Sequence, residues 1–229
     1  MRCRWVSLVL LTAGCASAAT LETVSPASDR LAVSVAADAL GSITIDGRDG
    51  QLDVSTTETD SVRIRVRLAG RCGEDAGFAL RTGRAGTTLS AKVEPSTKDR
   101  CDEHWTVEIP AALRVAAQMD RADVRVDGVG GGVELDIGNG TVRVAVPQGD
   151  LRAHVEKGDV IAVSRTRSPG RIRVEAEVGR VELRMFGGLV RHTPPPGPGD
   201  WIAVDGSGVD DMSVTSTVGN ATLVVGARD

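Results

Sequence analysis

The residues most able to bind a metal or to activate a nucleophile are three histidines and four cysteines. His104, His154 and His192 are far apart in the chain, and none belongs to an HxH or HExxH motif. Zinc sites draw their ligands from such short, fixed spacings. The sequence therefore predicts no metal site and no cofactor, and it favours solvated or locally hydrogen-bonded histidines.

Serine and carboxylate side chains form no recognisable catalytic group either. Ser207 lies in a Gly-Ser-Gly sequence and lacks the GxSxG elbow of a nucleophilic serine. A glycosidase or lyase needs clustered carboxylates. Here they are dispersed over outward strand positions: Glu134, Asp136, Asp150, Asp159, Glu175 and Glu182. We predict no catalytic residues, and a polysaccharide-active β-helix enzyme, a lyase or a hydrolase, is the alternative.

Two cysteines bracket a charged, glycine-rich segment. Cys72 and Cys101 are the cysteines that remain if the N-terminal segment is removed by cleavage, and neither belongs to a CxxC motif. Exported proteins meet an oxidising environment, so we predict a Cys72–Cys101 disulfide. Closing a loop of this length stabilises a fold by about 3–4 kcal/mol in the chain-entropy model.

The elements that position these residues come from a repeat of short strand units, each opened by a glycine. Gly140 precedes TVRVAV, Gly149 precedes DLRAHV, Gly158 precedes DVIAVS, Gly170 precedes RIRVEA and Gly179 precedes RVELRM. Apolar and polar residues alternate within each unit, which is typical of a strand with one buried face. The predicted inward residues include Val142, Val144, Leu151, Ala153, Val155, Val181, Leu183, Met185, Trp105, Val107 and Ile109.

Many of these units are nine residues apart, an odd period that would invert the inward face without a turn. Glycine can supply that turn because it reaches positive φ without steric cost. The pattern predicts an all-β fold, either a β-solenoid of short strands with about two strands per coil or an antiparallel β-sandwich. Small inward residues such as Ala153 and Ala162 favour the solenoid, which has a narrow core.

Two units per coil would place every second unit on one sheet. Arg152, Arg173 and Arg191 would then form one outward column. Like charges on neighbouring strands repel each other, so the column needs anionic partners. Flanking Asp150, His154 and Glu175 could relieve this repulsion within the molecule, or the column could bind an anionic polymer or a cell-surface component.

The N-terminal segment, 1–18, has the features of a secretory signal peptide: Arg2 and Arg4, then an apolar run and small residues. The sequence before Cys15 also resembles a lipobox, so lipidation of Cys15 is the alternative to simple cleavage near Ala18. Residues 19–229 are predicted to form a single β-repeat domain with an irregular insertion around 68–102, and no transmembrane segment is expected in the mature chain. We expect a periplasmic or cell-surface location, or alternatively an outer-membrane lipoprotein.

The net charge of −4, without a strongly basic run, argues against a nucleic-acid partner. The units at 41–45 (GSITI), 140–144 (GTVRV), 149–153 (GDLRA) and 158–162 (GDVIA) resemble those of the bacterial adhesin-like domains of unknown function, which are exported and solenoid-like. The resemblance implies a non-enzymatic cell-envelope scaffold or binding module of unknown ligand. Envelope proteins and anionic glycans are candidate partners, and a purely structural role is a further hypothesis.

Overall fold

The computed structural model describes residues 30–69, 78–95, 101–146, 148–164, 170–186, 191–193, 200–206 and 209–226. All regular secondary structure in these ranges is β. The strands are β1 (Arg30–Ala36), β2 (Ser42–Thr57), β3 (Ser61–Ala69), β4 (Phe78–Ala85), β5 (Thr88–Pro95), β6 (Asp102–Pro110), β7 (Arg114–Asp127), β8 (Val133–Val146), β9 (Leu151–Ser164), β10 (Ile172–Phe186), β11 (Arg191–Thr193), β12 (Asp200–Gly206) and β13 (Val209–Gly226). Among the described residues, no helix has the length and apolar character needed to cross a bilayer.

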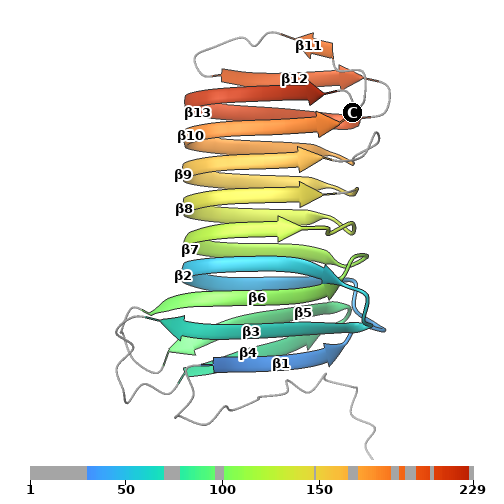
Figure 1. Ribbon diagram of the computed structural model, residues 1–229, viewed down its shortest axis with the longest axis vertical. Coiled ribbons are helices and arrows are strands. Elements are labelled where there is room, and N and C mark those ends of the chain that lie inside the picture. Colours follow the sequence, from blue (N-terminus) through green and yellow to red (C-terminus); the bar gives the residue numbers. More distant parts are fainter. Residues whose placement is uncertain are drawn as a thin grey trace, which may run out of the picture.

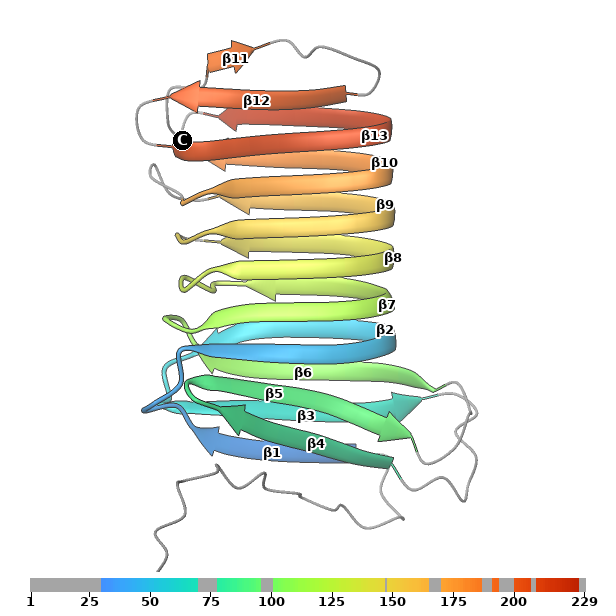
Figure 2. The same ribbon diagram turned by 180° about the vertical axis from the view of Figure 1, so that it is seen from behind.

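The strands form one open, mixed sheet in the order β1-β3-β6-β2-β7-β8-β9-β10-β13-β12-β11, with β5 paired to both β2 and β4. Figures 1 and 2 show a column in which the strands lie one above the other. The prediction of an all-β fold is confirmed.

Six long strands, β2, β7, β8, β9, β10 and β13, make up the middle of the column and run parallel to one another. We call these six strands the parallel stack, and each of them a rung. Every rung bends near its middle, so that its first half lies in one layer of the column and its second half in the other (Figures 1 and 2). The register is regular: Val133 of β8 pairs with Leu151 of β9, which pairs with Ile172 of β10.

The core lies between the two layers and is filled by the alternate side chains of each rung. In β9, Leu151, Ala153, Val155, Val160 and Ala162 are at most 1% exposed. All the inward residues predicted above are buried. Alternation of apolar and polar residues therefore identified the buried face of each half-rung correctly.

The glycines that mark the repeat have two different positions. Gly149 and Gly170 precede β9 and β10, but Gly140, Gly158, Gly179 and Gly219 lie within rungs, with φ between +139° and +148°. The prediction that each glycine opens a separate short strand is wrong at these four bends. The chain stays paired through the bend, so two predicted strands form one continuous rung.

Only glycine fits at these bends because the rungs approach each other closely there. A Cβ at Gly158 would overlap the carbonyl oxygen of Gly140, and a Cβ at Gly179 would overlap that of Gly158. The positive φ is also unfavourable for other residues. Glycine thus occupies the bend in five of the six rungs, β7 being the exception with Ala122 in register with Gly50.

The N-terminal end of the sheet, β1 and β3 to β6, has a different construction. Here β1, β3 and β6 pair antiparallel, and β4 and β5 form a hairpin. β5 then pairs with the first half of β2, while β6 pairs with the second half. Within the segment 68–102, the β4–β5 hairpin contributes buried Leu80, Leu89 and Val93 to the common core.

A buried carboxyl group belongs to this end of the molecule. Glu103 is 4% exposed, and its Oε2 accepts hydrogen bonds from Trp105 Nε1 at 2.8 Å and from the backbone N–H of Arg48 at 3.4 Å. Burial raises the pKa of Glu103, and the hydrogen bond from Trp105 partly offsets this effect.

Candidate functional site

Two of the three arginines predicted to form a column are direct neighbours. Arg152 lies in the first half of β9 and Arg173 in the first half of β10, and the two residues pair in register. Their side chains point outward and are 64% and 63% exposed. Two guanidinium groups therefore lie side by side on one face of the parallel stack.

The third arginine lies elsewhere. Arg191 is in β11 and pairs with Asp205 of β12, and both β12 and β13 lie between β11 and β10. The residue that follows Arg173 in the column is Ser213 of β13. The prediction placed Arg191 by counting glycine-opened units, but the chain after β10 forms two antiparallel strands at the end of the sheet before it returns as a rung.

A hollow of about 540 Å³ lies around Arg152 and Arg173, and Arg114 and Arg171 also line it. We call this hollow the arginine groove. Its lining includes Gly131, Gly132 and Gly149, which precede β8 and β9. Because glycine has no side chain, the loops between the rungs leave this space open to solvent.

Glu134 of β8 is shared by two of the arginines. Arg114 Nη2 donates a hydrogen bond to Glu134 Oε2 at 2.6 Å, and Arg152 Nη1 lies 3.5 Å from Oε1. Glu134 thus holds Arg114 tightly and Arg152 loosely. A guanidinium has five N–H donors, so a single carboxylate contact leaves donors available to a ligand.

Asp150 and Glu175 serve the other two arginines. The backbone N–H and Nη2 of Arg171 each donate a hydrogen bond of 2.9 Å to Asp150. These bonds, the backbone one first, hold the pKa of Asp150 below its usual value. Arg173 Nη2 lies 3.5 Å from Glu175 Oε2, a looser ion pair.

The charge repulsion within the arginine column is therefore relieved inside the molecule, as the first of the two hypotheses above states. The acidic residues that relieve it differ in part from the predicted ones. Glu175 contacts Arg173, but Asp150 contacts Arg171, and the partner of Arg152 is Glu134. The ring nitrogens of His154 lie 3.9 Å and 3.8 Å from Glu175 and Glu177. Four guanidinium groups face three carboxylates, an arrangement that can accept a further anionic group.

Sequence reasoning did not identify Arg114 and Arg171 as groove residues. Arg171 directly follows Gly170, as Asp150 follows Gly149, and this shared position after a loop glycine was the available signal. Arg114 begins β7, where no glycine marks the unit. Its place beside Glu134 follows only from the register of β7 with β8.

Of the three cysteines with predicted roles, Cys101 is the one that the structure describes. Cys101 is 9% exposed and belongs to the common core. Cys72 and Cys15 lie outside the described residues, so the Cys72–Cys101 disulfide and the lipidation of Cys15 stay predictions.

No protein-family model matches the chain, and no curated protein matches it. Solved structures do. A candidate cell adhesion protein from Clostridium sporogenes is 11% identical, with 86% of this chain and 96% of that chain covered at a TM-score of 0.53. A candidate adhesin from Bacteroides fragilis is 12% identical, with 87% and 98% covered at a TM-score of 0.32. The first similarity shows that a solved protein shares this all-β fold.

Proposed function

We propose that this protein is a non-enzymatic, adhesin-like binding module of the cell envelope, and that its arginine groove binds an acidic polysaccharide. In this proposal the parallel stack is a β-solenoid, in which each rung with its loop is one coil and each half-rung is one of its two strands. The fold shared with the Clostridium sporogenes protein, which is described as a candidate cell adhesion protein, supports the binding role.

The single observation that carries the proposal is the arginine groove itself. Four arginines with side chains that are 55–72% exposed converge on one hollow, and two of their contacts with carboxylates are as long as 3.5 Å. Arginine binds carboxylate and sulfate-like groups through paired N–H donors. An acidic sugar could therefore replace the loose ion pairs of Arg152 and Arg173.

Binding is favoured over glycosidic bond cleavage by the state of the carboxyl groups. A glycosidase needs a carboxylic acid that keeps its proton near neutral pH. In the groove, Asp150 has a lowered pKa because Arg171 stabilises its charge. Glu103, whose pKa burial raises, is buried against Trp105 and cannot reach a substrate.

The proposal includes export. Segment 1–18 would act as the signal peptide, residues 19–229 would form the mature domain in the periplasm or at the cell surface, and Cys72 and Cys101 would form a disulfide. Mass spectrometry of the protein extracted from the envelope separates the alternatives. A chain beginning near Ala19 means simple cleavage, whereas a diacylglycerol adduct on Cys15 means an outer-membrane lipoprotein.

Binding to immobilised dextran sulfate and polygalacturonate, with neutral dextran as the blank, tests the groove. We expect the Arg152→Gln/Arg173→Gln variant to lose about tenfold in affinity at the groove, since it loses two exposed charge-assisted contacts. Added salt should weaken the binding of the unmodified protein, because exposed charges are screened.

Arg125→Gln/Arg143→Gln is the matched control. These two arginines also pair in register on adjacent rungs, but Asp53 neighbours Arg125 in β2, and Asp123 and Asp127 flank it in β7. This variant removes the same charge and should bind as the unmodified protein does. If both double variants lose affinity equally, net charge alone accounts for binding and the groove has no special role.

A further inference from the structure

Three arginines project from one side of β3. Arg63, Arg65 and Arg67 alternate with the buried residues Val62, Ile64 and Val66, so all three guanidinium groups point outward. Alternate residues of a strand are about 6.8 Å apart, so the three charges form an evenly spaced line. We call these three residues the β3 arginine row.

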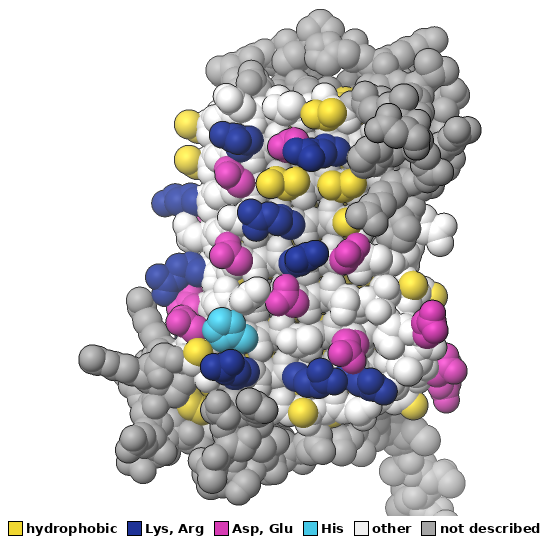
Figure 3. All heavy atoms as spheres, viewed as in Figure 1, with side chains coloured by type: hydrophobic (Ala, Val, Ile, Leu, Met, Phe, Trp, Pro, Cys, Tyr) yellow, Lys and Arg dark blue, Asp and Glu magenta, His cyan; other side chains and the backbone are white. Residues whose placement is uncertain are grey.

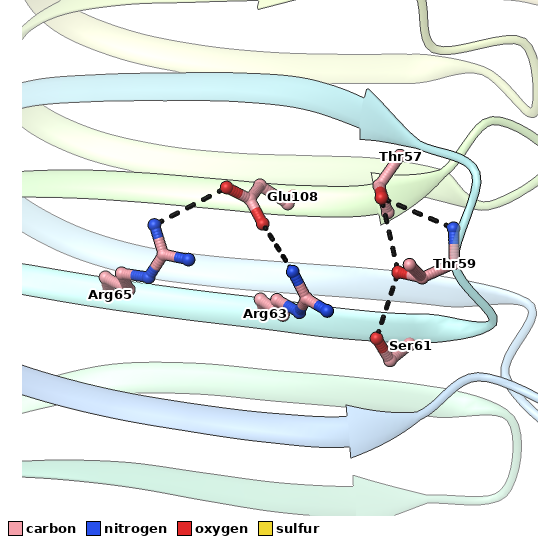
Figure 4. Close-up of polar contacts among 6 residues, drawn as sticks. All are labelled: Thr57, Thr59, Ser61, Arg63, Arg65 and Glu108. Carbon is pink, nitrogen blue, oxygen red and sulfur yellow. Dashed lines mark hydrogen bonds and ion pairs between the residues drawn. The ribbon is translucent and has the colours of Figure 1, made fainter.

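One carboxylate accompanies the row among the contacts of the described residues. Glu108 of β6 lies 3.5 Å from Arg63 Nη1 and 3.4 Å from Arg65 Nη1 (Figure 4). The other register partners in β6 are Thr106 and His104. The row is therefore less well neutralised than the arginine groove, and Figure 3 shows Lys and Arg side chains gathered at the lower end of this face.

A hollow of about 270 Å³ lies beside Arg65 and Arg67. Thr106 and His104 line it from β6, and Ala32 lines it from β1. The guanidinium groups, the threonine hydroxyl and the imidazole can all donate hydrogen bonds to one anionic group. The small side chain of Ala32 leaves this space accessible.

Hydroxyl groups continue the polar surface at the other end of the row. Thr59 Oγ1 lies 3.2 Å from Thr57 Oγ1 and 3.1 Å from Ser61 Oγ, in the connection between β2 and β3 (Figure 4). Ser61 is the outward residue that precedes Arg63 along β3. The surface thus combines cationic groups with hydroxyls, which suits a ligand that carries both anionic groups and hydroxyls.

We infer that the β3 arginine row, with His104 and Thr106, forms a second binding site for an acidic polysaccharide. Its layer is the opposite one from the arginine groove, because β3 and β6 continue the layer of the second half-rungs and the groove lies on first half-rungs. The site is independent of the groove. Single-stranded nucleic acid is disfavoured because it needs exposed aromatic side chains for stacking, and Trp105, the tryptophan of β6, is 1% exposed.

A molecule with one such site in each layer can hold two polymer chains at once. The protein would then cross-link acidic polysaccharide rather than only bind it. Cross-linking needs both sites, whereas binding needs either one.

Titration calorimetry of the full chain with a heparin-derived sulfated hexasaccharide tests the second site. We expect two tight equivalents for the unmodified protein and for Arg125→Gln/Arg143→Gln, but one tight equivalent for Arg65→Gln/Arg67→Gln and for Arg152→Gln/Arg173→Gln. Affinity at the altered site should fall about tenfold or more, the size expected for two exposed charge-assisted contacts.

The two proposals fail in different ways. If Arg65→Gln/Arg67→Gln leaves both stoichiometry and affinity unchanged, the second site is overturned, whatever the groove variant does. If only Arg152→Gln/Arg173→Gln has no effect, the groove is overturned and the second site stands. If a thymidine oligonucleotide binds the row more tightly than the hexasaccharide, the proposed ligand class is wrong.

A gain of affinity guards against variants that merely misfold. Glu108→Gln removes the carboxylate that competes with the ligand for Arg63 and Arg65, so affinity at the row should rise about twofold to fivefold. Light scattering with long dextran sulfate should show aggregates for the unmodified protein and none for Arg65→Gln/Arg67→Gln or Arg152→Gln/Arg173→Gln. Unchanged affinity of Glu108→Gln would contradict the assignment of the row.

Discussion

In the parallel stack, a residue has neighbours above and below that hold the same place in their own rungs, as Gly140, Gly158 and Gly179 do. At the N-terminal end, antiparallel pairs bring together residues of unlike position, such as Arg63 with Glu108 and Leu68 with Glu103. Both regions share one core and one alternation of apolar residues. They differ in which residues the strand pairing brings together: equivalent positions in the stack, and unlike positions at the N-terminal end.

This difference decides what each region tolerates. Repetition in the stack means that the same close approach recurs at the bends of Gly140, Gly158, Gly179 and Gly219, so a misfit at one level meets the backbone of the next. Antiparallel pairing at the N-terminal end gives each residue its own surroundings, which allows a buried carboxyl group to sit in the core beside a tryptophan. Three substitutions test this comparison, from the largest expected effect to the smallest.

Gly158→Ala should lower the free energy of unfolding by about 2–4 kcal/mol, since the methyl group would overlap the carbonyl oxygen of Gly140 at a positive φ. Gly86→Ala is the matched change in the β4–β5 turn. Its φ is +60° and no atom lies within 4 Å of the added Cβ, so the cost should be about 1–2 kcal/mol. Urea denaturation of both variants measures the difference, and equal losses would contradict the special role of the bend.

Glu103→Gln should change how stability depends on pH. The pKa of Glu103 is raised by burial, so the folded protein keeps this proton at pH values where the unfolded chain has lost it. The free energy of unfolding therefore falls as pH rises from the unfolded pKa, near 4.5, to the folded pKa, and stays constant above it.

The amide introduced by Glu103→Gln cannot ionise, so this dependence should disappear in the variant. Relative to the unmodified protein, the variant should gain about 1–3 kcal/mol as pH rises through the folded pKa of Glu103, the range for an incompletely solvated buried group. Glu108→Gln, an outward change on the same strand, is the control and should show no such gain. A parallel pH dependence for Glu103→Gln and the unmodified protein would remove Glu103 as its source.

Asp150→Asn should have the smallest effect, about 0.5 kcal/mol at neutral pH, because Asp150 is half exposed and solvent screens its pairing with Arg171. Its pKa is lowered, so its contribution is present above the unfolded value of about 3.8 and is lost as pH falls through the folded pKa. Thermal unfolding at pH 7 and pH 3 measures this. A larger difference at pH 3 than at pH 7 would have the wrong sign for an ion pair.

Alternation in the sequence was enough to predict the inward residues, because the side-chain period of a strand does not depend on which strands pair. It could not separate bend glycines from loop glycines. Gly149 and Gly158 open units of the same form, yet the first precedes a rung and the second lies inside one. The distinction depends on whether the chain stays hydrogen-bonded to its neighbours through the glycine, and spacing does not contain that information.

The candidate site was predicted in part for a related reason. Arg152 and Arg173 could be placed together because β9 and β10 follow each other as rungs. Arg191 could not, since counting units fails where the chain leaves the stack for β11 and β12. The β3 arginine row was visible in SVRIRVRLA as three arginines between apolar residues, but which acidic side chains lie beside it depends on antiparallel pairing.

The matched register of β8 and β9 has an evolutionary consequence. Val133 pairs with Leu151 and Gly140 with Gly158. Each residue of the segment from 133 to 150 therefore has the same position in its rung as its partner has in the next rung. Loss of that segment would bring β9 against β7 with its glycine and its buried residues already matched, and duplication would lengthen the column equally smoothly. Descendants of such a gene can therefore vary in reach by whole rungs while the two ends of the sheet remain unchanged.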